Sequence, residues 1–221
     1  MSTTKPLQVT DRSAVKRNPK RGCYDRATIE QILDEALVIH VGFIAQDQPF
    51  VIPMSYGRDG DLLYIHGAVA SRMLKNLEQG IEICVSATIL DGIVIARSLF
   101  HHSMNYRSVM LFGRATLVDD EQEKLHALKV LSEHIVPGQW EQARQPTPAE
   151  MKATTVLAFP IEEGSAKVRS GDPKDDAADY ELPIWAGQLP LKLTPGVPIP
   201  DSQLRSDIVV PENVLNYHRG V

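Results

Sequence analysis

Hydrophobic residues recur at helical spacing in two stretches of the chain. Residues 26–36 place four apolar side chains on one face, namely Ile29, Ile32, Leu33 and Ala36. Residues 120–134 repeat this spacing with Leu125, Leu128, Val130 and Leu131. An aspartate stands before each stretch, Asp25 and Asp119, as is typical of a helix N-cap. We therefore predict two amphipathic helices, with shorter helices over residues 70–79 and around Met151.

Runs of β-branched and apolar residues predict strands at residues 37–45, 50–56, 62–66, 81–90, 93–98, 109–118 and 156–161. Turn-forming residues at 47–49 and 57–60 separate the first three runs and predict a three-stranded meander. Strands and helices do not alternate regularly, which argues against a doubly wound parallel sheet. The pattern favours a mainly β fold with flanking helices, which we expect to be a small six-stranded antiparallel barrel, closed or split.

The chain divides by composition into three regions. Residues 1–21 form a basic arm, whose six Lys and Arg residues and one Asp give 6 − 1 = +5. Residues 22–170 contain the predicted barrel, and residues 171–221 form a Pro-rich extended tail. We predict that the arm is solvated or wraps a partner chain. A contact with nucleic acid or an anionic membrane, or a targeting peptide, is the alternative.

Composition narrows the class of protein. The 221 residues are 43% hydrophobic and 23% charged, as expected for a folded domain, and the net charge of −5 argues against general nucleic-acid binding. No apolar run approaches the ~20 residues of a membrane-spanning helix. Two cysteines, Cys23 and Cys84, are too few for a disulfide scaffold. We expect a buried Cys84 and a cytoplasmic location.

A candidate anion site follows the predicted strand 62–66. Ser71 and Arg72 open the next helix, where a hydroxyl and a guanidinium are available to a phosphate. An ordinary strand–helix turn, with Ser71 as the cap and Arg72 in solvent, explains the same residues. Pro53 lies inside a predicted strand, which places that strand at a sheet edge or beside a bound group.

Residues 97–108 form a polar stretch between apolar runs, with two Arg, two His, three Ser, an Asn and a Tyr. These side chains are either ligand-binding groups or a polar hairpin loop. His101 and His102 are adjacent and point to opposite faces of an extended chain, so by themselves they predict no metal site. The chain also lacks a Gly-x-Ser-x-Gly nucleophile motif.

At these same places the sequence resembles the pyridoxamine 5′-phosphate oxidase-related FMN-binding split-barrel proteins. The resemblance is to the branch that includes the nitroimidazole-resistance (Nim-type) flavoproteins. It rests on residues 41–43, 51–56, 63–68, 71–72, 91–92, 96–98, 101–109 and 112–113, and it extends from about Arg21 to Arg169. The string His-His-Ser-Met-Asn-Tyr-Arg-Ser, placed after His-Gly-Ala, is the most specific element.

The resemblance implies an FMN-binding split barrel that forms a two-fold homodimer with FMN at the subunit interface. It assigns FMN contacts to Val51, Ile52, Pro53, Met54, Ser55, Ile65, His66, Gly67, Ser71, Arg72, Asn105, Tyr106, Arg107, Ser108 and Trp185. It also gives His66 a catalytic role beside the flavin. Met73 stands where the oxidase has a lysine, and Ser108 stands where it has a glutamine.

Two functions follow from this resemblance. The first is an FMN-dependent oxidoreductase that takes electrons from NADH or NADPH and passes them to a small planar acceptor such as a nitroaromatic compound. The second is a protein that stores, senses or carries FMN or a related ligand without turnover. Neither requires a nucleophile, because the flavin supplies the redox chemistry.

Overall fold

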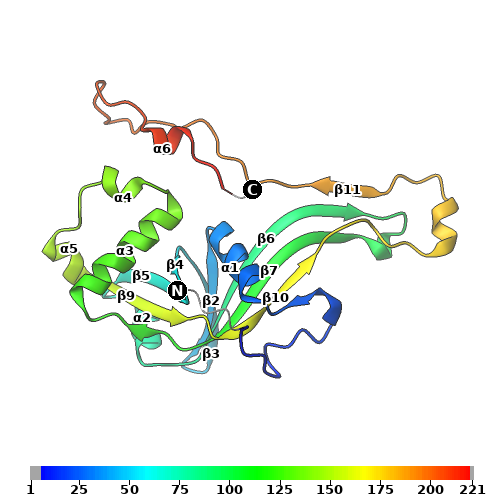
Figure 1. Cartoon of the computed structure of the whole chain (residues 1–221), viewed down its shortest axis with the longest axis horizontal. Helices are drawn as coiled ribbons and strands as arrows, with labels where there is room; N and C mark the ends of the chain where they lie inside the picture. Colours follow the sequence, from blue (N-terminus) through cyan, green and yellow to red (C-terminus); the bar gives the residue numbers. More distant parts are fainter. Residues whose placement is uncertain (1–5, 220–221) are drawn as a thin grey trace.

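Two antiparallel sheets and six α-helices make up the described part of the chain, residues 6–219, in the computed structural model (Figure 1). In the larger sheet the strand order is β1 (Gly22–Cys23), β10 (Glu163–Arg169), β7 (Ser103–Gly113), β6 (Ile83–Ile95), β2 (Ile39–Ala45) and β3 (Gln48–Met54). The smaller sheet has the order β4 (Gly57–Asp59), β5 (Leu62–Ala68), β9 (Thr154–Pro160) and β8 (Thr116–Leu117). The sheets do not close on each other, so the predicted split barrel is confirmed.

Helix α1 (Arg26–Glu35) closes the core between the sheets. Its N-cap Asp25 accepts a hydrogen bond from the backbone N–H of Thr28 at 2.8 Å, as its sequence pattern predicts. Ile29, Ile32 and Leu33 are buried against strands of both sheets. The short helix α2 (Arg72–Glu78) follows β5, with Ser71 as its N-cap.

Helix α3 (Glu121–Ile135) covers the other face of the smaller sheet. It begins after Asp120 instead of Asp119, and its buried side chains are Ala127 and Leu131. Leu125 was expected in the core but is 40% exposed, because the inward stripe of the helix runs through Ala127 and Leu131. Helices α4 (Gln139–Gln142) and α5 (Pro148–Ala153) lead on to β9.

The predicted three-stranded meander is wrong. Strands β2 and β3 do form a hairpin, but its turn lies at Gln46 and Asp47, which both have positive φ. The chain then leaves the larger sheet, and residues expected as a turn form β4 of the smaller one. Gly57 is needed in β4 for close packing, because a Cβ atom there would lie 2.7 Å from the Val130 carbonyl oxygen of α3.

Strands β6 and β7 form a long arm that extends beyond the barrel (Figure 1). The sequence predicted two strands where the structure has the single strand β6, with a register shift between Leu90 and Gly92. Beyond this shift a short strand of the tail, β11 (Gly187–Pro190), pairs with Gly92–Ile95. Neither β10 nor β11 was predicted, because neither has an alternating apolar pattern.

The described part of the basic arm docks on its own chain; residues 1–5 lie outside the described range. Leu7 is buried, and Gln8 bridges to Glu163 of β10. Arg12 forms ion pairs with Glu163 at 2.6 Å and with Glu82 at 3.0 Å. Cys23 and Cys84 are both free and half-buried, so the expectation of a fully buried Cys84 is wrong. None of the described helices has the length and apolar character needed to span a membrane.

Candidate functional site

A cavity of about 300 Å³ lies between the β2–β3 hairpin and α2. Its walls include the apolar side chains of Phe43, Phe50 and Ile52, and the polar residues at its edge are Ser71, Arg72, Asn76 and Gln46. Phe43 and Phe50 stack with their ring centroids 5.4 Å apart. An apolar wall with polar groups at one edge is typical of a nucleotide cofactor site.

Arg72 supplies the positive charge of this cavity. Its guanidinium lies 5.9 Å from the centroid of the Phe50 ring, and no carboxylate within residues 6–219 pairs with it. Ser71 accepts a hydrogen bond from the N–H of Leu74 at 3.4 Å, and Asn76 donates to the Arg72 carbonyl at 2.9 Å. Both contacts fix the start of α2, so the charge of Arg72 remains available to an anion.

Strand β3 presents two different faces beside this cavity. Ile52 and Met54 pack toward the core, whereas Val51 and Pro53 are exposed on the opposite face. Because β3 is the last strand of its sheet, Pro53 occupies the edge position that its missing N–H requires. Of the predicted contacts in β3, only Ile52 lines the cavity. Ser55 follows the end of the strand and is half-buried.

His66 on β5 is half-buried, and its Nδ1 atom is buried without a hydrogen-bond partner among residues 6–219. Burial lowers the pKa of the imidazole below its ordinary value, so His66 is neutral at physiological pH. Its neighbour Ile65 lies in the core. Gly67 leaves room for Leu74 of α2, whose side chain would lie 2.9 Å from a Cβ atom.

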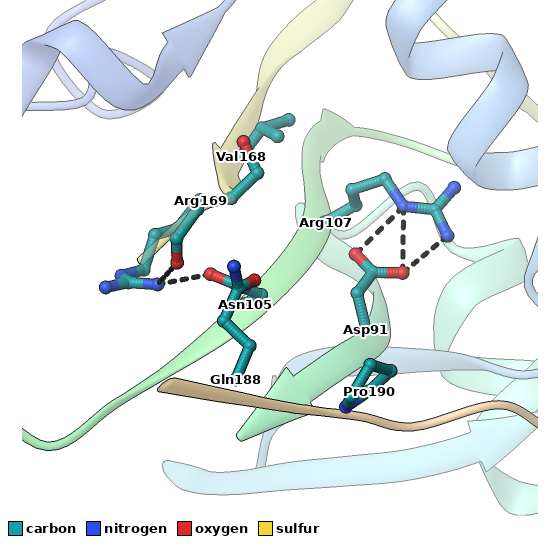
Figure 2. A pocket seen from close by; sticks show the side chains of 9 residues that line it. Asp91, Asn105, Arg107, Val168, Arg169, Gln188 and Pro190 are labelled. Carbon is teal, nitrogen blue, oxygen red and sulfur yellow. Dashed lines mark hydrogen bonds and ion pairs between the residues drawn. The ribbon is translucent and has the colours of Figure 1, made fainter. Parts of the chain in front are cut away.

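Two of the predicted site residues of β7, Asn105 and Arg107, line a second cavity (Figure 2). Its volume is about 390 Å³. The buried Asn105 bonds to Gln188 of β11 at 2.6 Å and accepts a hydrogen bond from Arg169. The Arg169 guanidinium also donates to the carbonyls of Gly171 and Asp172. This network joins β7, β10 and the tail.

Arg107 lies in the same cavity and is saturated by carboxylates. It pairs with Asp91 of β6 at 2.7 Å and with Glu35 at the end of α1. These partners raise the pKa of Arg107 through their hydrogen bonds, so the guanidinium stays charged. Ser108 donates to the Lys167 carbonyl at 3.3 Å, and Tyr106 is half-buried. The structure therefore places Ile52, Ser71 and Arg72 at the first cavity and Asn105 and Arg107 at the second, and the other predicted contacts line neither of them.

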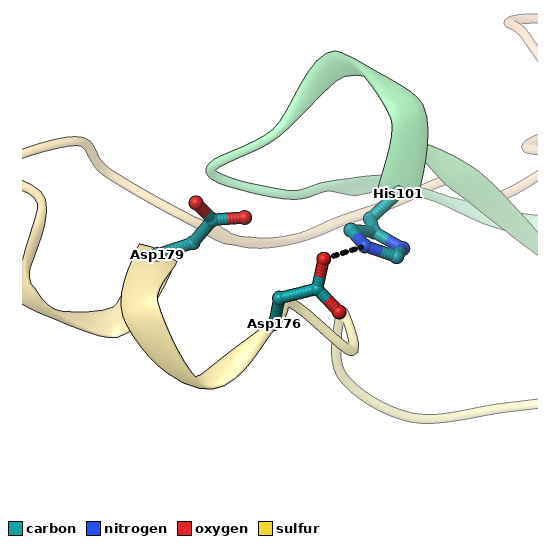
Figure 3. Close-up of side chains that lie close together, drawn as sticks. All are labelled: His101, Asp176 and Asp179. Carbon is teal, nitrogen blue, oxygen red and sulfur yellow. Dashed lines mark ion pairs between the residues drawn. The ribbon is translucent and has the colours of Figure 1, made fainter.

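The tail loop after β10 packs against the tip of the arm. Asp175 accepts hydrogen bonds from the backbone N–H groups of Arg97 and Ser98 at 3.0 and 3.2 Å. His101 approaches Asp176 at 3.4 Å, with Asp179 nearby (Figure 3). The three ligand atoms lie within 4.8 Å of one another, an arrangement that the spacing of His101 and His102 alone did not indicate. Trp185 follows this loop and is 67% exposed, away from both cavities.

A family model described as pyridoxamine 5′-phosphate oxidase matches residues 25–168. The chain belongs to the pyridoxamine 5′-phosphate oxidase family. The match includes both sheets except for β1 and β11, together with Arg72, His66 and Arg107. Arg169 and the tail lie outside it. Among curated proteins none matches the chain.

Three solved structures show how far the similarity to members and neighbours of this family extends. The flavocytochrome Anf3 from Azotobacter vinelandii is 41% identical, with a TM-score of 0.90, over 96% of this chain and 98% of that one. The FAD and heme binding protein from Mycobacterium smegmatis is 32% identical, with a TM-score of 0.85, over 88% of this chain and 96% of that one. A candidate 5-nitroimidazole antibiotic resistance protein from Bacteroides thetaiotaomicron shares the fold, at 24% identity and a TM-score of 0.57, over 66% and 86% of the two chains.

Sequence reasoning missed several residues of the two cavities. Phe43 and Phe50 appeared only as strand residues, and Asn76 as a helix residue. Glu35, Gln188 and Arg169 gave no local signal, because their partners are distant in sequence. Asp91 was quoted only for the resemblance, and its pairing with Arg107 depends on the register of β6 and β7.

Proposed function

We propose that this protein is a flavin-dependent oxidoreductase that holds a flavin nucleotide in the cavity between the β2–β3 hairpin and α2. The observation that carries the proposal is Arg72, a cation that pairs with no carboxylate of the described residues and lies at an apolar cavity lined by Phe43, Phe50 and Ile52. A flavin nucleotide combines an anionic phosphate with a large planar ring, and the cavity offers a group for each. The names of two solved structures that match most of this chain, a flavocytochrome and an FAD and heme binding protein, support this choice.

The residues that line this cavity fit the binding and orientation of a flavin nucleotide. Arg72 and the hydroxyl of Ser71 would hold the phosphate, and the Phe43–Phe50 pair would pack against apolar parts of the cofactor. When bound, the flavin would supply hydride and electron transfer. FMN, which the resemblance implies, and FAD, named for the Mycobacterium smegmatis protein, share the phosphate chemistry that Arg72 recognises.

The proposal includes a nicotinamide donor and a small planar acceptor, as the resemblance implies. It also includes a two-fold homodimer and a cytoplasmic location, which the two free cysteines support. Storage or sensing of a flavin without turnover is the competing function. Rapid mixing of the flavin-loaded protein with NADH or NADPH separates the two. We expect bleaching of the flavin absorbance, followed by its return when a nitroaromatic acceptor is added; a flavin that neither donor reduces would favour the competing function.

The first experiment is the visible absorption spectrum of the purified protein, followed by release and chromatography of any cofactor. We expect a flavin spectrum, with FMN and FAD distinguished by retention time. A colourless protein that takes up neither FMN nor FAD would overturn the proposal.

Haem binding is a second candidate function, favoured by the neutral imidazole of His66 and by its Nδ1 atom, which is unpartnered among residues 6–219. A neutral imidazole is the form that binds haem iron, and the buried Nδ1 of His66 lacks a partner within the described chain. A haem held by His66 would add one-electron chemistry. Two solved structures that match most of the chain are named as a flavocytochrome and as an FAD and heme binding protein.

Titration of the protein with haemin tests this role. We expect a sharp haem absorption band for the unaltered protein and its loss in His66→Ala. In the matched variant His126→Ala the imidazole removed is one already bonded to Asp59 at 2.7 Å, so the band should persist. Equal haem binding by both variants would exclude His66 as the iron ligand.

A further inference from the structure

The segment between β11 and α6 (Glu212–Leu215) carries several large apolar side chains that are mostly exposed. Residues 191–210 contain no helix or strand, and their backbone hydrogen bonds are local except at Leu191. The most exposed of their large apolar side chains are Leu193 at 77%, Val197 at 88%, Ile199 at 93% and Val209 at 81%. Two positive and two negative residues leave the segment with no net charge, so its recognition chemistry is apolar.

Both ends of this segment are nevertheless fixed. At its start β11 pairs with β6, and the Leu191 N–H donates to the Asp91 carbonyl at 3.0 Å. At its end Asn213 donates to the Pro137 carbonyl at 3.2 Å. Arg219 then donates to the carbonyls of Glu35 and Asp34 at 3.0 and 3.1 Å. In Figure 1 the segment runs above the body, turns and returns through α6.

A second apolar projection lies at the tip of the β6–β7 arm. Leu99 is 85% exposed and Phe100 is 88% exposed. The tail anchors the tip, because Asp175 binds its backbone and the Arg97 guanidinium lies over the Tyr180 ring at 4.9 Å. Two anchored projections with exposed apolar side chains indicate a protein contact.

The exposed area of the chain supports a large interface. A compact single chain of 24.5 kDa exposes about 10,000 Å². This chain exposes 14192 Å². Even if fully extended, the seven residues outside the described range would account for only about 1,100 Å² of the difference. About 3,000 Å² per chain remains, which exceeds what each subunit of a standard complex buries, about 800 Å².

The same chain also presents an apolar face that fits such projections. The strand register places Ile44, Val51 and Met110 on one face of the larger sheet, and these side chains are 66%, 67% and 45% exposed. In a two-fold dimer the apolar projections of each copy meet the apolar face of the other copy. A neutral apolar segment and an apolar face on one chain are therefore complementary in a pair of identical copies.

We propose that residues 191–210 form a strap that closes around a second copy of this chain, with Arg219 as the clasp that holds its far end. Each strap buries Leu193, Val197, Ile199 and Val209 on the partner copy, and the result is an intertwined homodimer. The inference deepens the dimer of the proposed function and rests on it, but it does not depend on which cofactor is bound.

Crosslinking of mixed isotopic chains tests the strap directly. Full-length light and heavy chains are unfolded, mixed and refolded, and then treated with an amine-reactive crosslinker. Lys192 lies in the strap and is exposed. We expect crosslinked peptides that join a light Lys192 to a heavy chain. Crosslinks from Lys192 that join only chains of the same isotope would overturn the proposal.

Sedimentation of a strap variant gives an independent measurement. In Val197→Asp/Ile199→Asp two charges are placed where the proposal buries apolar groups, so we expect the dimer dissociation constant to rise by roughly a hundredfold or more. The matched control Leu125→Asp alters an apolar side chain of α3, 40% exposed and outside the strap. An unaltered protein that sediments as a single chain, or a strap variant that dimerises as tightly as the control, would overturn the proposal.

The role of Arg219 as the clasp predicts how fast chains exchange between dimers. Arg219→Ala frees the end of the strap, and we expect isotopic chains of this variant to exchange at least tenfold faster than those of the unaltered protein, with Arg219→Lys between them. Flavin content is recorded for every sample. Mixed-isotope crosslinks in a protein that binds no flavin would uphold the strap and overturn the flavin proposal. Flavin binding by a species that contains one chain only would uphold the flavin proposal and overturn the strap.

Discussion

The guanidinium of Arg219 lies 2.8 Å from Nε2 of His134, and this contact joins the end of the tail to the last turn of α3. At this distance a charged guanidinium and a charged imidazole would repel each other, so the contact requires a neutral His134. Burial lowers the pKa of His134 to about 4, and the charges of Arg219 and Arg58 act in the same direction. The Ala36 carbonyl and Asp34 oppose this effect. The imidazole is therefore uncharged in the folded protein at neutral pH.

This shift predicts a loss of stability in acid. In the unfolded chain the histidine takes up a proton near pH 6.5, whereas in the folded protein it does so near pH 4. Between these values the unfolded state binds more protons, so the free energy of unfolding falls as the pH drops, by up to about 1.4 kcal/mol per pH unit. Urea unfolding between pH 7 and pH 4 measures the slope. We expect a smaller slope in His134→Gln than in the unaltered protein, and equal slopes would show that His134 does not account for the loss of stability.

Arg72 is expected to determine flavin affinity. Arg72→Ala removes the cation of the cavity and should raise the Kd of a flavin nucleotide by roughly tenfold to a hundredfold, as expected for a charged hydrogen bond. Lys75→Ala removes a positive charge from the same helix outside the cavity. Fluorescence titration with FMN and FAD compares the two variants. Equal losses of affinity would show that Arg72 acts only through the overall positive charge of the helix and not through a direct contact.

Arg107 is expected to contribute to stability through its two carboxylates. Arg107→Met leaves Glu35 and Asp91 without their partner, and we expect a cost of about 1–3 kcal/mol in the free energy of unfolding. Arg144→Met breaks the exposed pair with Glu150 and should leave the free energy of unfolding nearly unchanged, because solvent screens such a pair. Urea unfolding of both variants measures the difference. If Arg107→Met were as stable as Arg144→Met, the triad would contribute nothing to the fold.

Gly57 is expected to be intolerant of a side chain. A Cβ atom there would lie 2.7 Å from the Val130 carbonyl oxygen and 2.8 Å from the Leu131 nitrogen. Gly57→Ala must therefore push α3 away from β4, at a cost of roughly 1–3 kcal/mol or more. Thermal unfolding compares Gly57→Ala with the unaltered protein; equal midpoints would mean that α3 adjusts freely.

Much of the fold follows from local patterns in the sequence. The helical spacing around Ile32 and the cap at Asp25 define α1, because amphipathic periodicity and N-capping act within a few residues. The polar stretch 97–108 and the Ser71-Arg72 pair likewise indicated where binding groups would lie. The family resemblance, carried by the string 101–109, indicated the split barrel.

Only the tertiary structure decided which distant residues meet. Sequence spacing could not show that Arg107 pairs with Glu35, that Phe50 stacks on Phe43 beside Arg72, or that the tail supplies Gln188 to Asn105, because these contacts depend on strand register and on the path of residues 171–219. The sequence by itself determined the main helices and the apolar strands, because the forces that specify them are local, but it did not indicate β4, β10 or β11. The cavities, the docked arm and the anchored strap arise from long-range packing, where the partner of each side chain is set by the three-dimensional arrangement of the sheets.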